Sequence, residues 1–195
     1  MFINWKLREI NLKIVYYGPG LSGKTTNLEY IHSKMDPSLR GELVSLKTRE
    51  DRTIFFDFLQ IELAEIKGLK PKFNLYTVPG QVYYLASRKL VLQGADGVVF
   101  VVDSQPQRLE ENVETLKNLH ANLRELRQDP ANIPMVFQYN KRDLLDALPV
   151  EALRSSLQID GEIQIEAIAS QGVGVFETLK PAIRAAVSTV EKQIR

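Results

Sequence analysis

The chain has 195 residues, a formal net charge of +1 and 44% hydrophobic residues. This length suits one domain with a full core, expected here over residues 1–195, and the near-neutral charge gives no reason to expect a nucleic-acid partner. The absence of cysteine excludes disulfides, thiolate metal sites, palmitoylation and prenylation. No apolar run approaches the ~20 residues that span a bilayer. We therefore expect a cytoplasmic protein, monomeric on its own, with no intrinsic membrane anchor.

A strand, a glycine-rich loop and a helix follow one another near the N-terminus. Residues 12–17 are mostly apolar and predict a buried strand, and Leu28, Ile31 and Met35 recur at helical spacing. Between them, Gly18–Thr26 matches the pattern G-x-x-x-x-G-K-[ST]. This order of strand, loop and helix predicts a phosphate-binding P-loop.

The loop residues have defined chemical tasks in such a site. Its backbone N–H groups converge on an anion, and the start of the helix adds the positive end of its dipole. Lys24 is expected to reach the β- and γ-phosphates, and the Thr25 hydroxyl to bind Mg²⁺. Gly20 leaves room near the γ-phosphate. The residues expected to contact a nucleotide here are Gly18, Gly20, Leu21, Ser22, Gly23, Lys24, Thr25 and Thr26.

The next strand carries an irregular hydrophobic pattern. It follows a long connection over residues 39–53, and loops of that length are usually functional. Within residues 54–63 the apolar side chains change phase between Phe58 and Leu59. A β-bulge explains this change. The alternative is a strand with two registers, which would serve as two states of a nucleotide-sensing switch.

Strands and helices then alternate to the C-terminus. Further strands are predicted at 73–78, 97–103, 134–139 and 163–167, and helices at 87–92, 109–126, from 149 and at 176–194. This alternation predicts an α/β fold with a mostly parallel sheet covered by helices on both faces. Trp5, in the N-terminal extended segment, is expected to pack against this sheet.

The segment Asn140-Lys141-Arg142-Asp143 indicates which base is bound. The Asp143 carboxylate can accept hydrogen bonds from N1–H and the exocyclic amine of guanine, whereas adenine offers neither donor there. Lys141 is expected to pack its stem across the base or ribose, with Asn140 in the same motif. After the last strand, Ala169 and Ser170 are expected to bind the nucleotide, with the Ala169 N–H directed at the guanine O6.

These motifs together resemble a known family. They resemble the small Ras/Arf-like P-loop GTPases, and most closely the bacterial gliding-motility and cell-polarity branch of MglA-type GTPases. The matching segments are Gly18–Thr26, Asp51–Thr53, Thr77–Gln81, Val101–Ser104, Asn140–Asp143 and Ala167–Ser170. The resemblance covers nearly the whole chain and implies the Ras-like P-loop fold.

The resemblance also implies the catalytic set and the partners. Thr53 joins Thr25 as a ligand of Mg²⁺, and Gly80 senses the γ-phosphate through its N–H. Gln81 orients the attacking water and Arg52 acts as an arginine finger in cis, which stabilises transition-state charge in such enzymes. For both, a merely exposed loop residue is the alternative. Implied partners are GTP and GDP, a roadblock-type (MglB-like) activating protein, and polarity or motility effectors at a cell pole.

Thr77 departs from the usual family pattern. Most small GTPases have an aspartate there that helps to hold Mg²⁺ through water, and a neutral threonine leaves metal binding to Thr25, Thr53 and the phosphates. Asp103, which follows a buried strand, is a candidate substitute, although an aspartate at that position commonly orders a loop or caps a helix. Thr77 is also a strand-favouring residue.

The sequence therefore predicts a GTP-hydrolysing molecular switch, slow without an activating partner. The γ-phosphate and Mg²⁺ would order residues 39–53 and 79–85, and hydrolysis would release them. One alternative is a nucleotide-holding adaptor with negligible hydrolysis. Another is a metabolic P-loop kinase or ATPase, which the guanine-selective Asp143 argues against.

Overall fold

The computed structural model describes residues 2–47, 53–63, 68–80 and 85–193. In these residues, eight strands form one sheet in the order β3-β4-β5-β2-β6-β7-β8, with β1 paired to β2. The strands are β1 (Phe2–Asn4), β2 (Glu9–Tyr17), β3 (Val44–Lys47), β4 (Thr53–Glu62), β5 (Lys70–Thr77), β6 (Gly97–Asp103), β7 (Met135–Asn140) and β8 (Ile163–Glu166). Strands β5, β2, β6, β7 and β8 run parallel, while β3, β4 and β1 are antiparallel to their neighbours. The predicted mostly parallel α/β sheet is confirmed.

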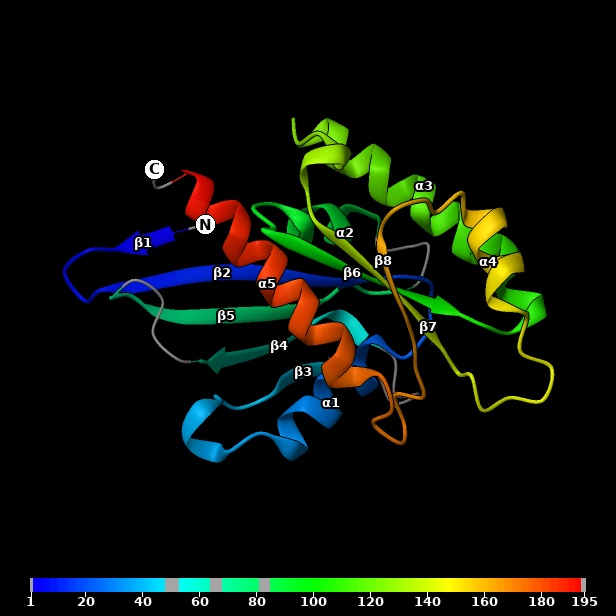
Figure 1. The fold of residues 1–195 in the computed structure, drawn as a ribbon, viewed down its shortest axis with the longest axis horizontal. Coiled ribbons are helices and arrows are strands. Elements are labelled where there is room, and N and C mark those ends of the chain that lie inside the picture. Colours follow the sequence, from blue (N-terminus) through cyan, green and yellow to red (C-terminus); the bar gives the residue numbers. More distant parts are fainter. Residues whose placement is uncertain (1, 48–52, 64–67, 81–84, 194–195) are drawn as a thin grey trace.

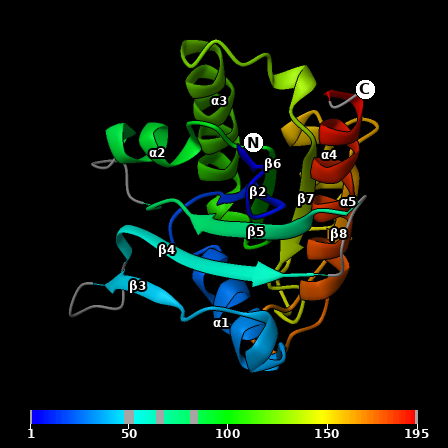
Figure 2. The same ribbon diagram turned by 90° about the vertical axis from the view of Figure 1, so that its left-hand side faces the viewer.

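Helices cover both faces of the sheet. They are α1 (Lys24–Lys34), α2 (Leu85–Leu92), α3 (Leu109–Glu125), α4 (Val150–Leu157) and α5 (Val175–Gln193). The apolar faces of α1 and α5 pack with Ile14 and Leu75 in one core cluster, whereas α2, α3 and α4 pack with Phe100 in a second. Figure 1 shows α5 crossing the sheet, and Figure 2 shows α1 on one side of β4 and β5 and α2 and α3 on the other. Because β6 is buried on both faces, its uninterrupted apolar run is explained.

The long connection between α1 and β4 is not wholly irregular, contrary to the prediction. Residues Pro37–Leu39 form a 3-10 turn, and Val44–Lys47 form strand β3, which pairs with β4 through Val44 opposite Phe58. The four residues of β3 are too few for an alternating pattern to stand out in the sequence. The sheet therefore extends one strand further than predicted.

The phase change in β4 does not produce a bulge at Phe58 and Leu59. From Phe58 to Glu62 the strand pairs with β5 in unbroken register, and Leu59 and Ile61 are buried beneath α1 and α5. Phe58 lies on the other face, where its ring packs against Tyr76 at a centroid distance of 4.9 Å. An irregularity does occur a few residues earlier, where the pairing of β4 with β3 shifts between Ser45 and Lys47. Both faces of β4 therefore carry apolar side chains, which accounts for the mixed pattern.

Trp5 does not pack against the sheet, so that prediction was wrong. Strand β1 folds back on β2 as a short hairpin, and Trp5 lies in its turn with 69% of its surface exposed. Ile3 instead provides the core contact of this hairpin, opposite Ile10. No helix among the described residues is long and apolar enough to cross a membrane.

Candidate nucleotide-binding site

The P-loop connects the end of β2 to the start of α1 with its glycines in demanding conformations. Gly18 has φ +144° and Gly23 has φ +102°, which L side chains rarely adopt. A Cβ on Gly18 would lie 2.3 Å from the Val101 carbonyl oxygen, and one on Gly23 would lie 2.1 Å from Nδ2 of Asn140. Both glycines are therefore required by backbone conformation and by close neighbours.

Lys24 folds back over the loop. Its ammonium donates to the carbonyl oxygens of Gly18 (3.1 Å) and Pro19 (2.6 Å). Burial, together with the positive charge of Arg88, lowers the pKa of Lys24 to about 7, although the Asp57 carboxylate opposes the shift. A phosphate group would supply the negative charge that restores the ordinary pKa of this lysine.

A buried carboxylate, Asp57, lies directly beside the Thr25 hydroxyl. Thr25 donates to Oδ2 of Asp57 at 2.5 Å, and Thr77 donates to the same oxygen at 2.7 Å. The backbone N–H of Asp57 in turn donates to the Thr77 hydroxyl at 2.9 Å, and Ser45 donates to Oδ1. The Asp57 side chain is fully buried. The structure thus places a carboxylate at the hydroxyl that the P-loop pattern assigns to Mg²⁺, and it comes from β4 instead of β5.

Sequence reasoning missed Asp57, although a signal was present. The carboxylate occupies the same face of β4 as Leu59 and Ile61, which are both fully buried. A charged group at a core-facing strand position is costly unless it has strong partners or holds a metal. Asp103 is engaged elsewhere: it accepts from the backbone N–H of Gln105 at 3.1 Å and from Lys141 at 2.5 Å. These contacts are the loop-ordering role considered for it.

The segment after β5 rests on the P-loop. A Cβ added to Gly80 would lie 2.2 Å from Cα of Gly20, so the two glycine backbones are in close contact. Arg88, a buried residue of α2, donates to the carbonyl oxygens of Pro79 (2.9 Å) and Gly80 (2.6 Å). Arg108 donates to the carbonyl oxygen of Gly20 at 2.5 Å. These two arginines, which sequence analysis did not single out, hold the backbones on each side of the contact.

The base motif joins three nucleotide-binding segments. The Asn140 side chain donates from Nδ2 to the Ser22 carbonyl oxygen at 2.8 Å and accepts from the Ala169 backbone N–H at 2.9 Å. Lys141 has φ +66°, and its ammonium bonds Asp103 and, at 3.0 Å, the side-chain oxygen of Gln105. The structure therefore brings the P-loop, the Asn140–Asp143 motif and the Ala167–Ser170 segment together, as predicted.

A second polar contact layer lies behind this motif. Gln138, two residues before Asn140, exchanges hydrogen bonds with Asn27 of α1 at 2.8 and 2.9 Å and donates to Thr178 of α5 at 2.9 Å. Asn27 also donates to the Gly23 carbonyl oxygen at 2.9 Å. All three side chains are fully buried. This network fixes the first turn of α1 to β7 and α5, and sequence analysis had not identified it.

The remaining predicted residues differ in exposure, and some are incompletely described. Asp143, Leu21 and Ser170 have exposed side chains, Thr26 is half-buried, and Ser22 is buried. Thr53 begins β4, where its backbone pairs with Lys47. Arg52 and Gln81, the predicted catalytic pair, lie outside the described residues.

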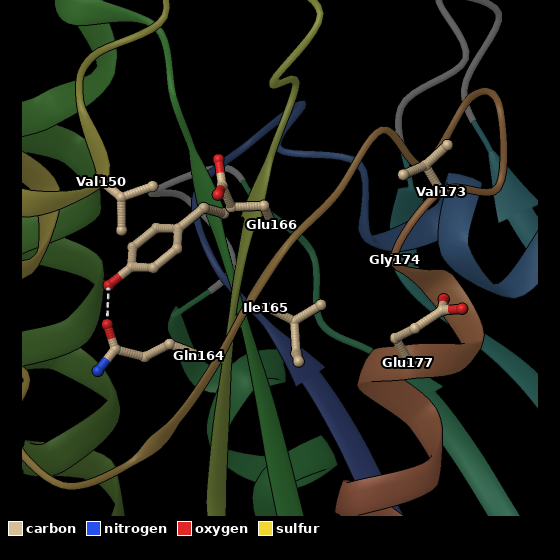
Figure 3. Close-up of a pocket in the computed structure, with 8 residues that line it drawn as sticks. Val150, Gln164, Ile165, Glu166, Val173, Gly174 and Glu177 are labelled. Carbon is tan, nitrogen blue, oxygen red and sulfur yellow. Dashed lines mark hydrogen bonds between the residues drawn. The ribbon is translucent and has the colours of Figure 1, made fainter.

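A separate pocket lies along the edge strand β8 (Figure 3). Its volume is about 630 Å³, and its lining comprises Tyr139, Val150, Gln164, Ile165, Glu166, Val173, Gly174 and Glu177. The Tyr139 hydroxyl donates to Oε1 of Gln164 at 2.8 Å, the contact dashed in Figure 3. None of the predicted nucleotide-binding residues lines this pocket, so it is not the site assembled by the three motifs.

Comparison with known proteins identifies the family of this chain. The sequence profile of the ADP-ribosylation factor family matches residues 1–185. The chain belongs to this family, which is part of the Arf/Ras-like GTPases, GTP-binding proteins that generally hydrolyse GTP with Mg²⁺. A relative is the mutual gliding-motility protein MglA of Myxococcus xanthus strain DK1622, 56% identical over 191 residues. The matched region covers 98% of each chain.

Proposed function

We propose that this chain is a GTP-hydrolysing switch that controls cell polarity or gliding motility through a partner protein. The observation that carries the proposal is the hydrogen bond from Thr25, at the end of the P-loop, to the buried Asp57 carboxylate. The Asp57 carboxylate supplies the negative charge that a threonine at position 77 cannot. The relation to a gliding-motility protein over nearly its full length supports the biological role. In this proposal residues 1–195 act as one GTPase domain.

Asp57 is proposed to complete the metal site. The Thr25 hydroxyl is a suitable ligand for Mg²⁺, and the adjacent carboxylate suits a metal-bound water, because Mg²⁺ prefers oxygen ligands and retains several waters. Bound Mg²⁺ would neutralise charge on the phosphates. Thr53 is proposed as a further ligand when its loop closes. Thr77 then keeps a supporting role by donating its hydroxyl hydrogen to Asp57.

Guanine selection is assigned to Asp143. Its exposed carboxylate follows a loop that is held by Asn140 and by the ion pair of Lys141 with Asp103. A carboxylate at this place is matched by the N1–H and amine of guanine and mismatched by adenine. We propose that Lys141 packs across the base, and that the buried Ala169 N–H, now bonded to Asn140, lies next to the guanine O6.

Hydrolysis is assigned to Gln81 and Arg52, with Gly80 as the sensor of the γ-phosphate. Gln81 would orient the attacking water, and Arg52 would stabilise the charge that develops during phosphoryl transfer. Gly80 already contacts Gly20 of the P-loop, which places its backbone beside the phosphate-binding segment. A roadblock-type activating protein is proposed to accelerate a slow intrinsic reaction. Effectors at a cell pole are proposed to recruit the protein from the cytoplasm.

The two-register hypothesis for β4 belongs to this switch. The pairing of β4 with β3 shifts between Ser45 and Lys47, while its pairing with β5 is regular from Phe58 onward. We propose that the switch includes a register shift of residues 54–63 between the two nucleotide states. Structures loaded with GDP and with a GTP analogue would test it, and identical pairing in both would eliminate it.

The decisive experiment is single-turnover phosphate release from GTP-loaded protein, compared with Arg52→Ala and Gln81→Ala. A wild-type rate near ~10⁻² s⁻¹ with a large loss in both variants is expected if the arginine acts in cis. Arg184→Ala is the matched control, because this arginine is exposed on α5. Undetectable release from all forms, with GTP still bound, would support the adaptor alternative. Displacement of GTP by ATP would instead support a kinase or ATPase.

A further inference from the structure

The hairpin of β1 and β2 exposes an unusual group of side chains at its turn. Trp5 is 69% exposed, Phe2 64% and Leu7 58%. Lys6 and Arg8 are exposed beside them. We call these five residues the hairpin patch. Single exposed apolar side chains are ordinary, but three large ones within six residues, alternating with two cations, are not explained by folding.

The hairpin is held to the sheet, so its exposure is a property of the fold. Ile3 packs on the core opposite Ile10, and the Leu7 N–H donates to the Asn4 side chain at 3.1 Å to close the turn. The Arg8 carbonyl oxygen accepts from the backbone N–H of Lys70 at 2.7 Å, which ties the turn to the start of β5. The turn residues therefore project from an anchored support and cannot fold inward to bury their side chains.

The described residues next to the turn give the hairpin patch a positive charge. Lys6 and Arg8 belong to it, and exposed Lys70 lies beside the Arg8 backbone. Glu9, the nearest acidic residue along the chain, is paired with Lys72 at 2.8 Å. The patch thus combines a tryptophan, two other large apolar groups and two basic residues, Lys6 and Arg8, that form no ion pair with another described residue. This is the composition favoured where a protein meets an anionic bilayer surface.

The position of the hairpin patch suits such a role. The turn leads into the N-terminal end of β2, whereas the P-loop follows the C-terminal end of the same strand. Figure 1 shows the hairpin at one end of the molecule, with β2 extending away from it. A membrane bound at the hairpin would therefore leave the nucleotide loops accessible to partners. Neither the pocket along β8 nor the one between α3 and α4 includes residues of the hairpin patch.

We propose that the hairpin patch adsorbs to the surface of membranes that contain anionic lipid, with Trp5 inserted at the headgroup level. Three side chains and two charges give weak, reversible adsorption, since even a myristoyl chain binds only marginally. It would act together with a partner that recruits the protein. This inference does not depend on the GTPase reaction.

Trp5 is the only tryptophan in the chain, so its fluorescence reports directly on the proposed contact. The full-length protein would be titrated with vesicles of phosphatidylglycerol and phosphatidylcholine at low and physiological salt. A blue shift of the emission, quenching by brominated lipid, and sedimentation with the vesicles are expected. Lys6→Glu/Arg8→Glu should reduce binding at least about tenfold, since each basic residue near such a surface contributes about fivefold.

Matched leucine variants locate the contact. Leu7→Gln should weaken sedimentation with vesicles, whereas Leu90→Gln should not, because Leu90 is similarly exposed (61%) but lies on α2. Nucleotide binding by each variant would confirm that it is folded. The proposal is overturned if the wild-type emission and sedimentation do not change with anionic vesicles at low salt. It is also overturned if the charge-reversal and Leu7→Gln variants bind as well as the wild type.

Discussion

Replacement of Asp57 by asparagine tests the proposed metal site most directly. Asparagine has the same shape, and the hydroxyls of Thr25 and Thr77, now 2.5 and 2.7 Å from Oδ2, can turn to donate or accept. Hydrogen bonds to a charged acceptor contribute about 1.5–3 kcal/mol and neutral ones about 1 kcal/mol. The difference of ~0.5–2 kcal/mol corresponds to a roughly twofold to thirtyfold lower Mg²⁺ affinity. Asp57→Asn should therefore need correspondingly more Mg²⁺ to retain bound nucleotide.

The assay is the dissociation rate of a fluorescent GDP analogue as a function of Mg²⁺ concentration. Asp96→Asn is the control, because the Asp96 carboxylate is likewise hydrogen-bonded, to the Lys13 backbone N–H at 2.8 Å, but is far from the P-loop along β2. Asp57→Asn/Thr77→Asp should recover part of the Mg²⁺ affinity by restoring a carboxylate on the neighbouring strand. Thr77→Asp alone should impair the protein, since two adjacent carboxylates resist joint ionisation. An unchanged Mg²⁺ dependence in Asp57→Asn would refute the assignment.

Three further predictions concern the other parts of the site. Gly80→Ala cannot keep the present contact with Gly20. Phosphate release should therefore slow about 10²-fold, while the affinity for GDP, measured by titration, should change little. Asp143→Asn should weaken GTP binding by ~1–3 kcal/mol in a competition assay. The affinity for xanthosine triphosphate should rise, because its C2 oxygen can accept a hydrogen bond from the asparagine amide. Nucleotide affinity should fall as the pH rises from 7 toward 10, by up to about tenfold per pH unit. In the nucleotide-free protein the pKa of Lys24 is lowered to about 7, so above this pH the side chain must take up a proton to bind phosphate. A flat pH profile, or no proton uptake in calorimetry, would contradict the last.

The parts of the site that were predictable are contiguous in the chain. In the P-loop, a buried strand, glycines at fixed spacing and a helix are all adjacent, so one short pattern contains the anion site. The Asn140–Asp143 motif follows a buried strand in the same way. Their meeting in space follows from the parallel sheet, because the carboxyl ends of parallel strands lie at one edge. The contact of Asn140 with the Ser22 carbonyl and the Ala169 N–H is the result.

The N-terminal hairpin shows where hydrophobic pattern misleads. The sequence analysis predicted that Trp5 packs against the sheet. The structure uses Ile3 for that contact, and the turn after Asn4 carries Trp5 away from the sheet. A sequence pattern cannot separate a buried aromatic residue from one that is exposed for binding when the element is only three residues long.

Predicting Asp57 as the carboxylate of the proposed metal site would have required knowledge of the strand register. Phe58 of β4 pairs with Tyr76 of β5, so Asp57 and Thr77 come next in the ladder and point to the same face, toward α1. Side chains opposite each other on antiparallel strands have Cβ atoms ~4.5–5.5 Å apart, so a carboxylate can reach nearly the same point from either strand. The motif that contains Thr77, taken along the chain alone, indicates that the usual carboxylate is missing. Across the sheet, Thr77 donates to the Asp57 carboxylate, so in the proposed metal site the negative charge comes from a residue twenty positions earlier in the sequence.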